Sequence, residues 1–119
     1  MYSHLNFPLT ETLRKYPVLS QLMRVASSNY ETGVPGYMIE KDTMVLIPIE
    51  AYQNDQNIFP EPEKFQPERF EVDEVQKRHA TSWMPFGEGP RNCIGMRFGV
   101  MQTRIGLISL WVIRSCHSL

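Results

Sequence analysis

The stretch 51–83 constrains the fold of this chain most, because it has almost no periodic apolar pattern. Five of the nine prolines fall between Pro48 and Pro85. Connections in compact domains have a median length of about 4–6 residues, so a much longer irregular segment usually packs against other elements. We therefore predict that residues 51–83 form an irregular meander, whose shape depends on contacts with the segments before and after it.

Length, charge and cysteine content exclude several classes of protein. The chain has 119 residues, which is enough for one domain at most. Its 12 basic and 13 acidic residues leave a net charge of −1, which argues against a nucleic-acid partner because phosphates need a basic surface. Two cysteines are too few for a disulfide framework. The longest apolar run, 105–113, is far shorter than the ~20 residues that cross a bilayer.

Two helices are predicted, over residues 8–16 and 94–112. The first begins near Pro8, which suits an initial helical turn, and ends before Pro17, which cannot continue the helix. The second carries one apolar stripe, with residues spaced by 4, 3, 4, 3 and 4 positions. The stripe consists of Ile94, Phe98, Met101, Ile105, Ile108 and Val112.

A β region is predicted between the helices, over residues 20–49. Apolar side chains occupy both alternating faces of the strand at 44–49, so both faces are expected to be buried. Residues 33–36 contain two glycines and a proline and predict a turn, which leads into a short partner strand at 37–39. The predicted fold class is mixed, mainly α with a small β-sheet.

The segment 84–93 reads as a glycine-rich loop that delivers a cysteine to the start of a helix. Gly87 and Gly89 permit positive φ and allow a flat group to approach the backbone closely. Helix N–H groups and the helix dipole favour a thiolate at Cys93, and Arg91 adds a cation beside it. This arrangement indicates a nucleophile or a metal ligand.

Other interpretations of the loop fit less well. A dinucleotide fingerprint has a third glycine where Asn92 stands, and a phosphate loop ends in Gly-Lys-Ser/Thr, which is absent. A zinc site needs three or four ligands, and Cys116 and His117 lie roughly 35 Å away along the helix. A cysteine protease needs a histidine, for which His79 is the local candidate. A buried, purely structural Cys93 is the plainest alternative.

Three motifs, in this order along the chain, resemble those of the cytochrome P-450 family. They are Glu11-x-x-Arg14, Pro67-Glu68-Arg69-Phe70 and Phe86-x-x-Gly89-x-Arg91-x-Cys93-x-Gly95. The resemblance extends over about 11–110 and is greatest to the insect microsomal branch that handles xenobiotics. It implies a partial cytochrome P-450 fold, with residues 1–119 forming a single C-terminal fragment of the haem-binding domain.

The resemblance also implies roles for individual residues. Cys93 would be the axial ligand of haem iron, with Phe86 beneath the porphyrin and with Gly89 and Gly95 as the motif glycines. Arg24 and Arg91 would bind the haem propionates. Glu11, Arg14 and Arg69 would form a buried structural cluster that holds the meander. The substrate side of the haem would be lined by Val18, Leu19, Ser20 and Leu22.

The implied function is haem-thiolate monooxygenation. One atom of O2 would enter a lipophilic small molecule and the other would become water, with electrons from NADPH through a flavoprotein reductase. The location implied is the cytosolic face of the endoplasmic reticulum membrane, reached through an N-terminal anchor that this chain lacks. We expect only the proximal haem-binding part here, with no catalytic group besides Cys93.

Two alternatives remain open. One is a catalytically incompetent haem-binding fragment that neither folds nor turns over alone, and the other is a small protein with a reactive or structural cysteine and no haem. Pro8, three residues before Glu11, departs from the family pattern and predicts a shortened helix. Residues after Leu110 no longer resemble the family, so we expect a partial gene product with foreign ends. Such a chain should expose large apolar patches.

Overall fold

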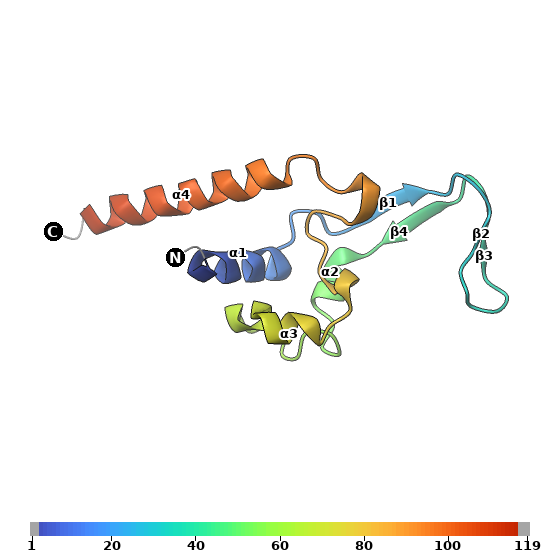
Figure 1. The fold of residues 1–119 in the computed structure, drawn as a ribbon, viewed down its shortest axis with the longest axis horizontal. Helices are drawn as coiled ribbons and strands as arrows, with labels where there is room; N and C mark the ends of the chain where they lie inside the picture. The colour runs from blue at the N-terminus through green and yellow to red at the C-terminus, as the bar shows by residue number, and fades with distance from the viewer. Residues whose placement is uncertain (1–2, 117–119) are drawn as a thin grey trace.

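The computed structural model describes residues 3–116 as an elongated arrangement of helices and two short β-ribbons (Figure 1). It measures 66 × 29 × 23 Å. Its radius of gyration is 17.9 Å, against about 13–14 Å for a compact domain of this length. In chain order the elements are α1 (Ser3–Lys15), β1 (Leu22–Val25), β2 (Tyr30–Glu31), β3 (Met38–Ile39), β4 (Met44–Ile47), α2 (Ile49–Gln53), the 3-10 helix η1 (Pro67–Phe70), α3 (Val72–Gln76), the 3-10 helices η2 (Ala80–Ser82) and η3 (Gly89–Arg91), and α4 (Met96–Cys116). The mixed fold class predicted from the sequence is confirmed.

Helix α1 begins at Ser3, so the predicted start near Pro8 and the predicted shortening of this helix are wrong. Pro8 lies inside the helix, where it lacks the N–H that would bond to the carbonyl four residues earlier. Its own carbonyl accepts a second donor, because Thr12 Oγ1 donates to it over 2.8 Å. Burial of Leu9, Glu11 and Arg14 outweighs the cost of the proline.

Strand β4 pairs antiparallel with β1, in a register that places Leu22 opposite Ile47 and Arg24 opposite Val45. The predicted pairing of 37–39 with this strand is wrong. Strand β3 pairs with β2 instead, because Gly33 and Gly36 adopt φ of 77° and 82° and turn the chain back on itself locally.

The expectation that both faces of 44–49 are buried is also wrong. Met44 and Leu46 are 66% and 50% exposed, because each ribbon has two strands and no described element covers their outer face. The structure also ends the strand at Ile47 and begins α2 at Ile49.

The meander over 51–83 is more regular than predicted. It contains the end of α2, the helix α3 and two 3-10 helices. Each is too short for an apolar repeat to appear in the sequence. The apolar core lies where α1, α2 and η1 meet, and its buried side chains are Leu9, Ile49, Phe59 and Phe70.

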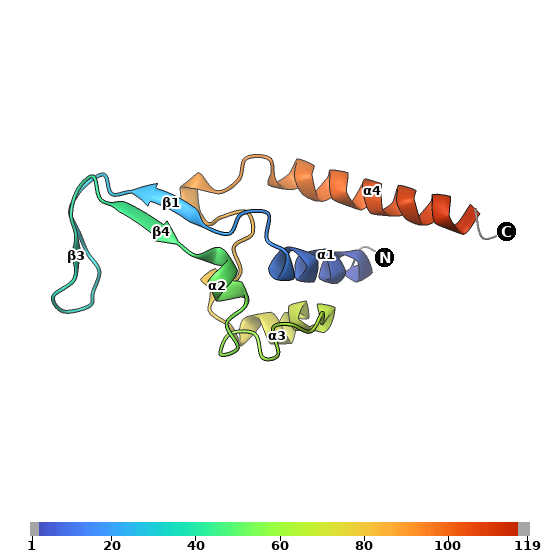
Figure 2. The same cartoon turned by 180° about the vertical axis from the view of Figure 1, so that it is seen from behind.

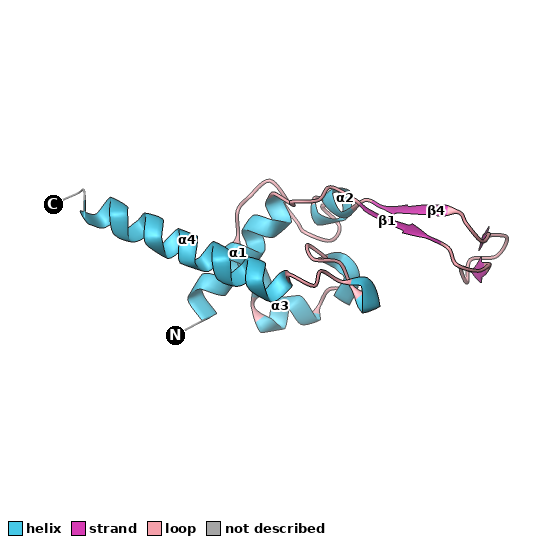
Figure 3. Cartoon of the chain, turned by 90° about the horizontal axis from the view of Figure 1, so that it is seen from above, coloured by secondary structure: helices cyan, strands magenta, loops and turns pink. Residues whose placement is uncertain are grey.

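Helix α4 extends away from the core at the opposite end of the long axis from the β2–β3 ribbon (Figures 1 and 2). It begins two residues after the predicted start and continues to Cys116, rather than ending at Val112. Every member of the predicted apolar stripe is exposed, from 47% at Ile108 to 105% at Ile94. In the view of Figure 3, α4 overlaps α1 and extends beyond it.

The accessible surface is large for the size of the chain. It amounts to 9587 Å², whereas a compact monomer of this mass exposes about 6,700 Å². Among the described helices, none combines the length and the apolar composition that crossing a membrane requires.

Candidate functional site

The cysteine loop over 84–93 is closed by its own backbone. Cys93 N donates to Phe86 O over 2.8 Å, and Gly87 N donates to Met84 O over 3.0 Å. Gly87 and Gly89 adopt φ of 73° and 77°, which other residues rarely adopt. These bonds bring the two ends of the loop together and fix where Cys93 emerges.

Gly87 is also the point at which the loop contacts strand β1. A Cβ placed there would lie 3.7 Å from Leu22 Cδ1 and 3.9 Å from Arg24 Nη2. Around Gly89, by contrast, nothing lies within 4 Å of such an atom. Gly87 therefore permits both the turn and the close approach of strand β1, whereas Gly89 permits the turn alone.

Cys93 is a free, exposed thiol that precedes α4. The prediction that it stands directly at the helix start needs correction, because the helix begins at Met96. Two bonds build the transition from loop to helix: Met96 N donates to Cys93 O over 3.3 Å, and Gly99 N donates to Gly95 O over 2.8 Å. The sulfur faces Gly95, where a Cβ would lie 3.9 Å from Sγ.

Cys93 lines a pocket of about 320 Å³, which falls within the ~300–1,000 Å³ of small-molecule sites. Its other lining residues are Leu13, Val18, Leu19, Leu22, Arg24, Pro85, Phe86, Gly87 and Arg91. Most of the residues that the sequence predicted are therefore brought together. Ser20, Gly89 and Gly95 are not part of the lining.

Two arginines meet at the edge of this pocket. Arg24 Nη1 donates to Met23 O over 2.8 Å, and Arg24 Nη2 reaches Arg91 O at 3.5 Å. The second contact links strand β1 to the backbone of the cysteine loop, and both arginines line the same pocket as Cys93. Guanidinium groups bind carboxylates through two parallel hydrogen bonds.

The donor set of the pocket fits haem. A thiolate is a soft ligand suited to iron, and Cys93 provides the sulfur. Apolar side chains suit the porphyrin face, while Arg24 and Arg91 suit its two propionates. Phe86 lies between the pocket and the first turn of α4, where a Cβ on Gly99 would be 4.0 Å from its ring.

The alternative sites find less support. His79 bonds locally, with Nδ1 2.8 Å from Thr81 Oγ1, and it does not line the pocket of Cys93. Among residues 3–116, no group of three or more His, Cys, Asp and Glu side chains is placed to hold a metal ion. His117 lies outside the described residues, as does the side chain of Cys116.

Glu11 and Arg14 form a buried ion pair with no exposed surface on either side chain. Arg14 Nε is 2.7 Å from Glu11 Oε2, and Arg14 Nη2 donates to Oε1 over 2.9 Å, so the contact is bidentate. The helix spacing i, i+3 puts both on one face of α1.

The structure brings Arg69 to the same carboxylate. Arg69 Nε lies 3.7 Å from Glu11 Oε1, which is an ionic contact rather than a hydrogen bond. Arg69 Nη2 donates instead to Glu61 O over 2.8 Å. We refer to Glu11, Arg14 and Arg69 as the carboxylate cluster.

The carboxylate cluster binds the backbone of the meander at several points. Arg14 donates to Gln53 O over 2.8 Å and to Pro62 O over 2.7 Å. Glu11 Oε1 accepts Gln66 N over 3.0 Å. These long-range bonds explain how an irregular segment keeps one geometry.

Sequence reasoning missed several residues of these sites. Gln53 is fully buried, and its Nε2 donates to the carbonyls of Leu13 and Arg14 over 3.1 and 3.0 Å. No local pattern marks Gln53. Leu13 and Pro85 lie inside or beside recognised motifs, so their proximity to those motifs was the available signal.

Comparisons with known proteins agree with the motifs. A model of the cytochrome P450 family matches residues 4–113. The chain is similar to three proteins of Drosophila melanogaster: probable cytochrome P450 6a20 (50% identity over 108 residues), cytochrome P450 6a2 (50% over 111) and probable cytochrome P450 6a23 (52% over 100). These matches cover 91%, 91% and 84% of this chain, but 22%, 22% and 20% of the relatives. The chain thus spans about a fifth of the length of the curated relatives it matches.

Proposed function

Because the chain belongs to the cytochrome P450 family, we propose that it forms the thiolate side of the haem site of a monooxygenase. Haem is the cofactor of this family. When bound, haem supplies oxygen activation at its iron, and a thiolate ligand favours cleavage of the O–O bond. The observation that carries the proposal is the free thiol of Cys93 in an apolar pocket edged by Arg24 and Arg91.

Several lining residues have a defined task in this proposal. Cys93 donates its thiolate to iron, and the closed loop holds the sulfur in place. Arg24 and Arg91 orient the cofactor by binding its carboxylates. Phe86 and the leucines of the lining exclude water, which strengthens every electrostatic contact inside.

The carboxylate cluster supports the site without reacting. We propose that Glu11, Arg14 and Arg69 hold the meander in one geometry. The cysteine loop that follows it then places Cys93 in the pocket. Their burial removes them from any substrate. Glu11 is the shared partner of both arginines, so its removal would leave two buried guanidinium groups without a counter-charge.

The whole protein would act on a lipophilic small molecule. We propose a flavoprotein reductase as the electron-supplying partner, using NADPH, and a place at the cytosolic face of the endoplasmic reticulum membrane. Similarity to the Drosophila 6a proteins supports an insect xenobiotic-handling branch. Val18, Leu19 and Leu22 on the pocket wall are the proposed substrate-side residues, and Ser20 is weaker because it is outside the lining.

A second candidate is a haem-binding chain that does not turn over by itself. Among the described residues of the pocket lining, there is no carboxylate and no hydroxyl to deliver a proton. Catalysis that needs proton delivery would then depend on groups from elsewhere in a longer protein.

The test uses the 119-residue chain and a host chimera. In the host chimera, the matched residues of this chain replace their equivalents in full-length cytochrome P450 6a2 of Drosophila melanogaster. Haem is added, the protein is reduced and treated with carbon monoxide, and the absorbance spectrum is recorded. In the host chimera we expect a thiolate-type spectrum that Cys93→Ala abolishes.

A thiolate-type spectrum that survives Cys93→Ala would overturn the assignment of the ligand. Turnover of a lipophilic substrate with reductase then separates the two candidates. Oxidation by the 119-residue chain itself would favour the enzyme, whereas a correct spectrum without oxidation would favour the haem-binding chain.

A further inference from the structure

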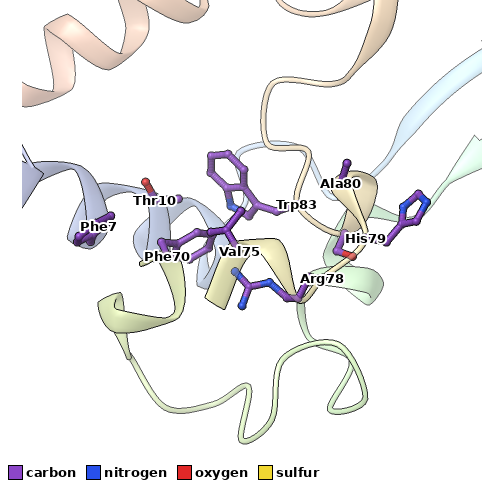
Figure 4. Close-up of a pocket in the computed structure, with 9 residues that line it drawn as sticks. Phe7, Thr10, Phe70, Val75, Arg78, His79, Ala80 and Trp83 are labelled. Atoms are coloured by element: carbon purple, nitrogen blue, oxygen red, sulfur yellow. The ribbon is translucent and has the colours of Figure 1, made fainter. Parts of the chain in front are cut away.

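Arg78 follows α3 by two residues, and its side chain points back toward the core (Figure 4). Its guanidinium carbon lies 4.8 Å from the ring centroid of Phe59 and 5.4 Å from that of Phe70. Arg78 Nη2 also donates to Arg69 O over 2.6 Å. One guanidinium thus contacts two core rings and the backbone of the carboxylate cluster, although Arg78 belongs to none of the recognised motifs.

These contacts continue toward the cysteine loop. The rings of Phe59 and Phe70 are 6.4 Å apart between centroids, and those of Phe70 and Trp83 are 5.4 Å apart. Arg14 of the carboxylate cluster also contacts Phe59, with its guanidinium carbon 5.5 Å from the ring centroid. A continuous series therefore runs from Arg14 through Phe59, Arg78 and Phe70 to Trp83, the residue just before the loop.

The surroundings of Arg78 suit a planar cation better than a point charge. Arg78 lines a pocket of about 290 Å³ together with Phe70, Val75 and Trp83 (Figure 4). Burial is the main cause that lowers the pKa of Arg78, and the charge of Glu74 partly opposes it. A guanidinium can lie over aromatic faces while its edge donates to a carbonyl, which a lysine ammonium cannot do in the same way.

We propose that Arg78 is a positioning residue for the cysteine loop, which it holds through the Phe59–Phe70–Trp83 ring series and the carbonyl of Arg69. The inference rests on the proposed function, since the loop matters only if Cys93 binds iron. Arg78 touches neither the cofactor pocket nor the thiol. It acts by fixing the direction in which Trp83 enters the loop, and thus the position of the sulfur.

The test compares Arg78→Lys and Arg78→Met in the host chimera with the neighbouring control Lys77→Met. Lys77 carries the same charge but is exposed and pairs with Glu74. Two quantities are measured on each protein: total bound haem, and the thiolate-type signal after reduction and carbon monoxide. Their ratio reports how the retained haem is ligated, independently of how much protein is folded.

We expect the equilibrium between thiolate-ligated and otherwise ligated haem to shift about two- to fivefold away from the thiolate for each ring contact that is lost, because a cation over a ring contributes that factor at a partly exposed site. The ratio should fall accordingly. Arg78→Met should fall furthest, Arg78→Lys should fail to restore the ratio, and Lys77→Met should match the parent. If Arg78→Met binds no haem, the ratio measured for the milder variant Arg78→Lys tests the proposal.

An unchanged ratio in the Arg78 variants would overturn the proposal. So would a parallel loss of haem and signal, because that pattern indicates general destabilisation rather than misplacement of the sulfur. Failure of the proposed function looks different: it appears as a thiolate-type signal that persists in Cys93→Ala, whatever residue stands at position 78.

Discussion

Replacing Glu11 with glutamine should destabilise the protein more than any other single change of charge in the carboxylate cluster. Glu11 has no exposed surface and accepts hydrogen bonds from Arg14 Nε at 2.7 Å, Arg14 Nη2 at 2.9 Å and Gln66 N at 3.0 Å. It also faces Arg69 Nε at 3.7 Å. Glutamine keeps the shape but leaves two buried guanidinium groups without a counter-charge.

The magnitude follows from what remains buried. Removing one partner of a buried ion pair costs about 3–5 kcal/mol, because the other charge is stranded. Arg14 keeps its bonds to the carbonyls of Gln53 and Pro62, so the lower half of that range applies. Whole domains are stable by only about 5–15 kcal/mol, so the loss is a large fraction of the total.

The assay is denaturant unfolding of the host chimera with and without Glu11→Gln, followed by circular dichroism. Glu74→Gln is the matched control, because Glu74 also pairs at i, i+3, with Lys77, but on the exposed surface. We expect a clear drop in the unfolding midpoint for Glu11→Gln and a much smaller drop for the control, which loses only an exposed pair. A loss below about 1 kcal/mol, the size of an exposed pair, would refute the reasoning.

Three further predictions concern the pocket, the surface and the isolated chain. In the host chimera, the double variant Arg24→Ala and Arg91→Ala should retain less haem on a desalting column, because the hydrogen bonds to the two haem propionates are lost. Retention equal to that of the parent would contradict the roles assigned to these arginines. A hydrogen bond from Lys77, followed by its charge, lowers the pKa of Glu74. The folded state therefore gains stability above the ordinary pKa of glutamate and loses it as pH falls through the lowered value, so the difference in melting temperature between parent and Glu74→Gln should vanish in strong acid. The 119-residue chain by itself should aggregate or bind a hydrophobic dye, because its accessible surface exceeds that of a compact monomer by about 2,900 Å². At ~25 cal/mol per Å², a few hundred Å² of uncovered apolar surface is enough to offset the stability of a domain. A monomer with a single cooperative transition would show that this reasoning is mistaken.

Local chemistry made several features of the site predictable. The Cys93 loop was recognisable because positive φ at Gly87 and Gly89 requires glycine, and the bond from Cys93 N to Phe86 O joins residues within the motif itself. The pair Glu11 and Arg14 was recognisable because a spacing of three places both on one helix face. These interactions span few residues, so their signals survive in the order of the amino acids.

Long-range contacts were not predictable in this way. Pro8 predicted a shorter α1, yet burial of Leu9 and of the carboxylate cluster keeps the helix continuous. The partner of β4 was assigned to its sequence neighbour 37–39, yet the distant strand β1 pairs with it. Both errors arise because burial and pairing are decided by segments far away in the chain.

The sequence by itself determined which sulfur the cysteine loop presents, that Arg91 stands beside it in the chain, and which helices and turns are locally favoured, whereas Arg24 was predicted only through the family resemblance. Only the tertiary structure decided that Gln53 bonds to the end of α1, that Arg78 lies against the rings of both Phe59 and Phe70, and that the stripe on α4 is left uncovered. The physical reason is that turn geometry and helix faces depend on neighbours a few residues apart. Burial depends instead on which distant surfaces meet. An apolar stripe indicates that a helix face is suited to burial, but it does not identify the segment that covers it.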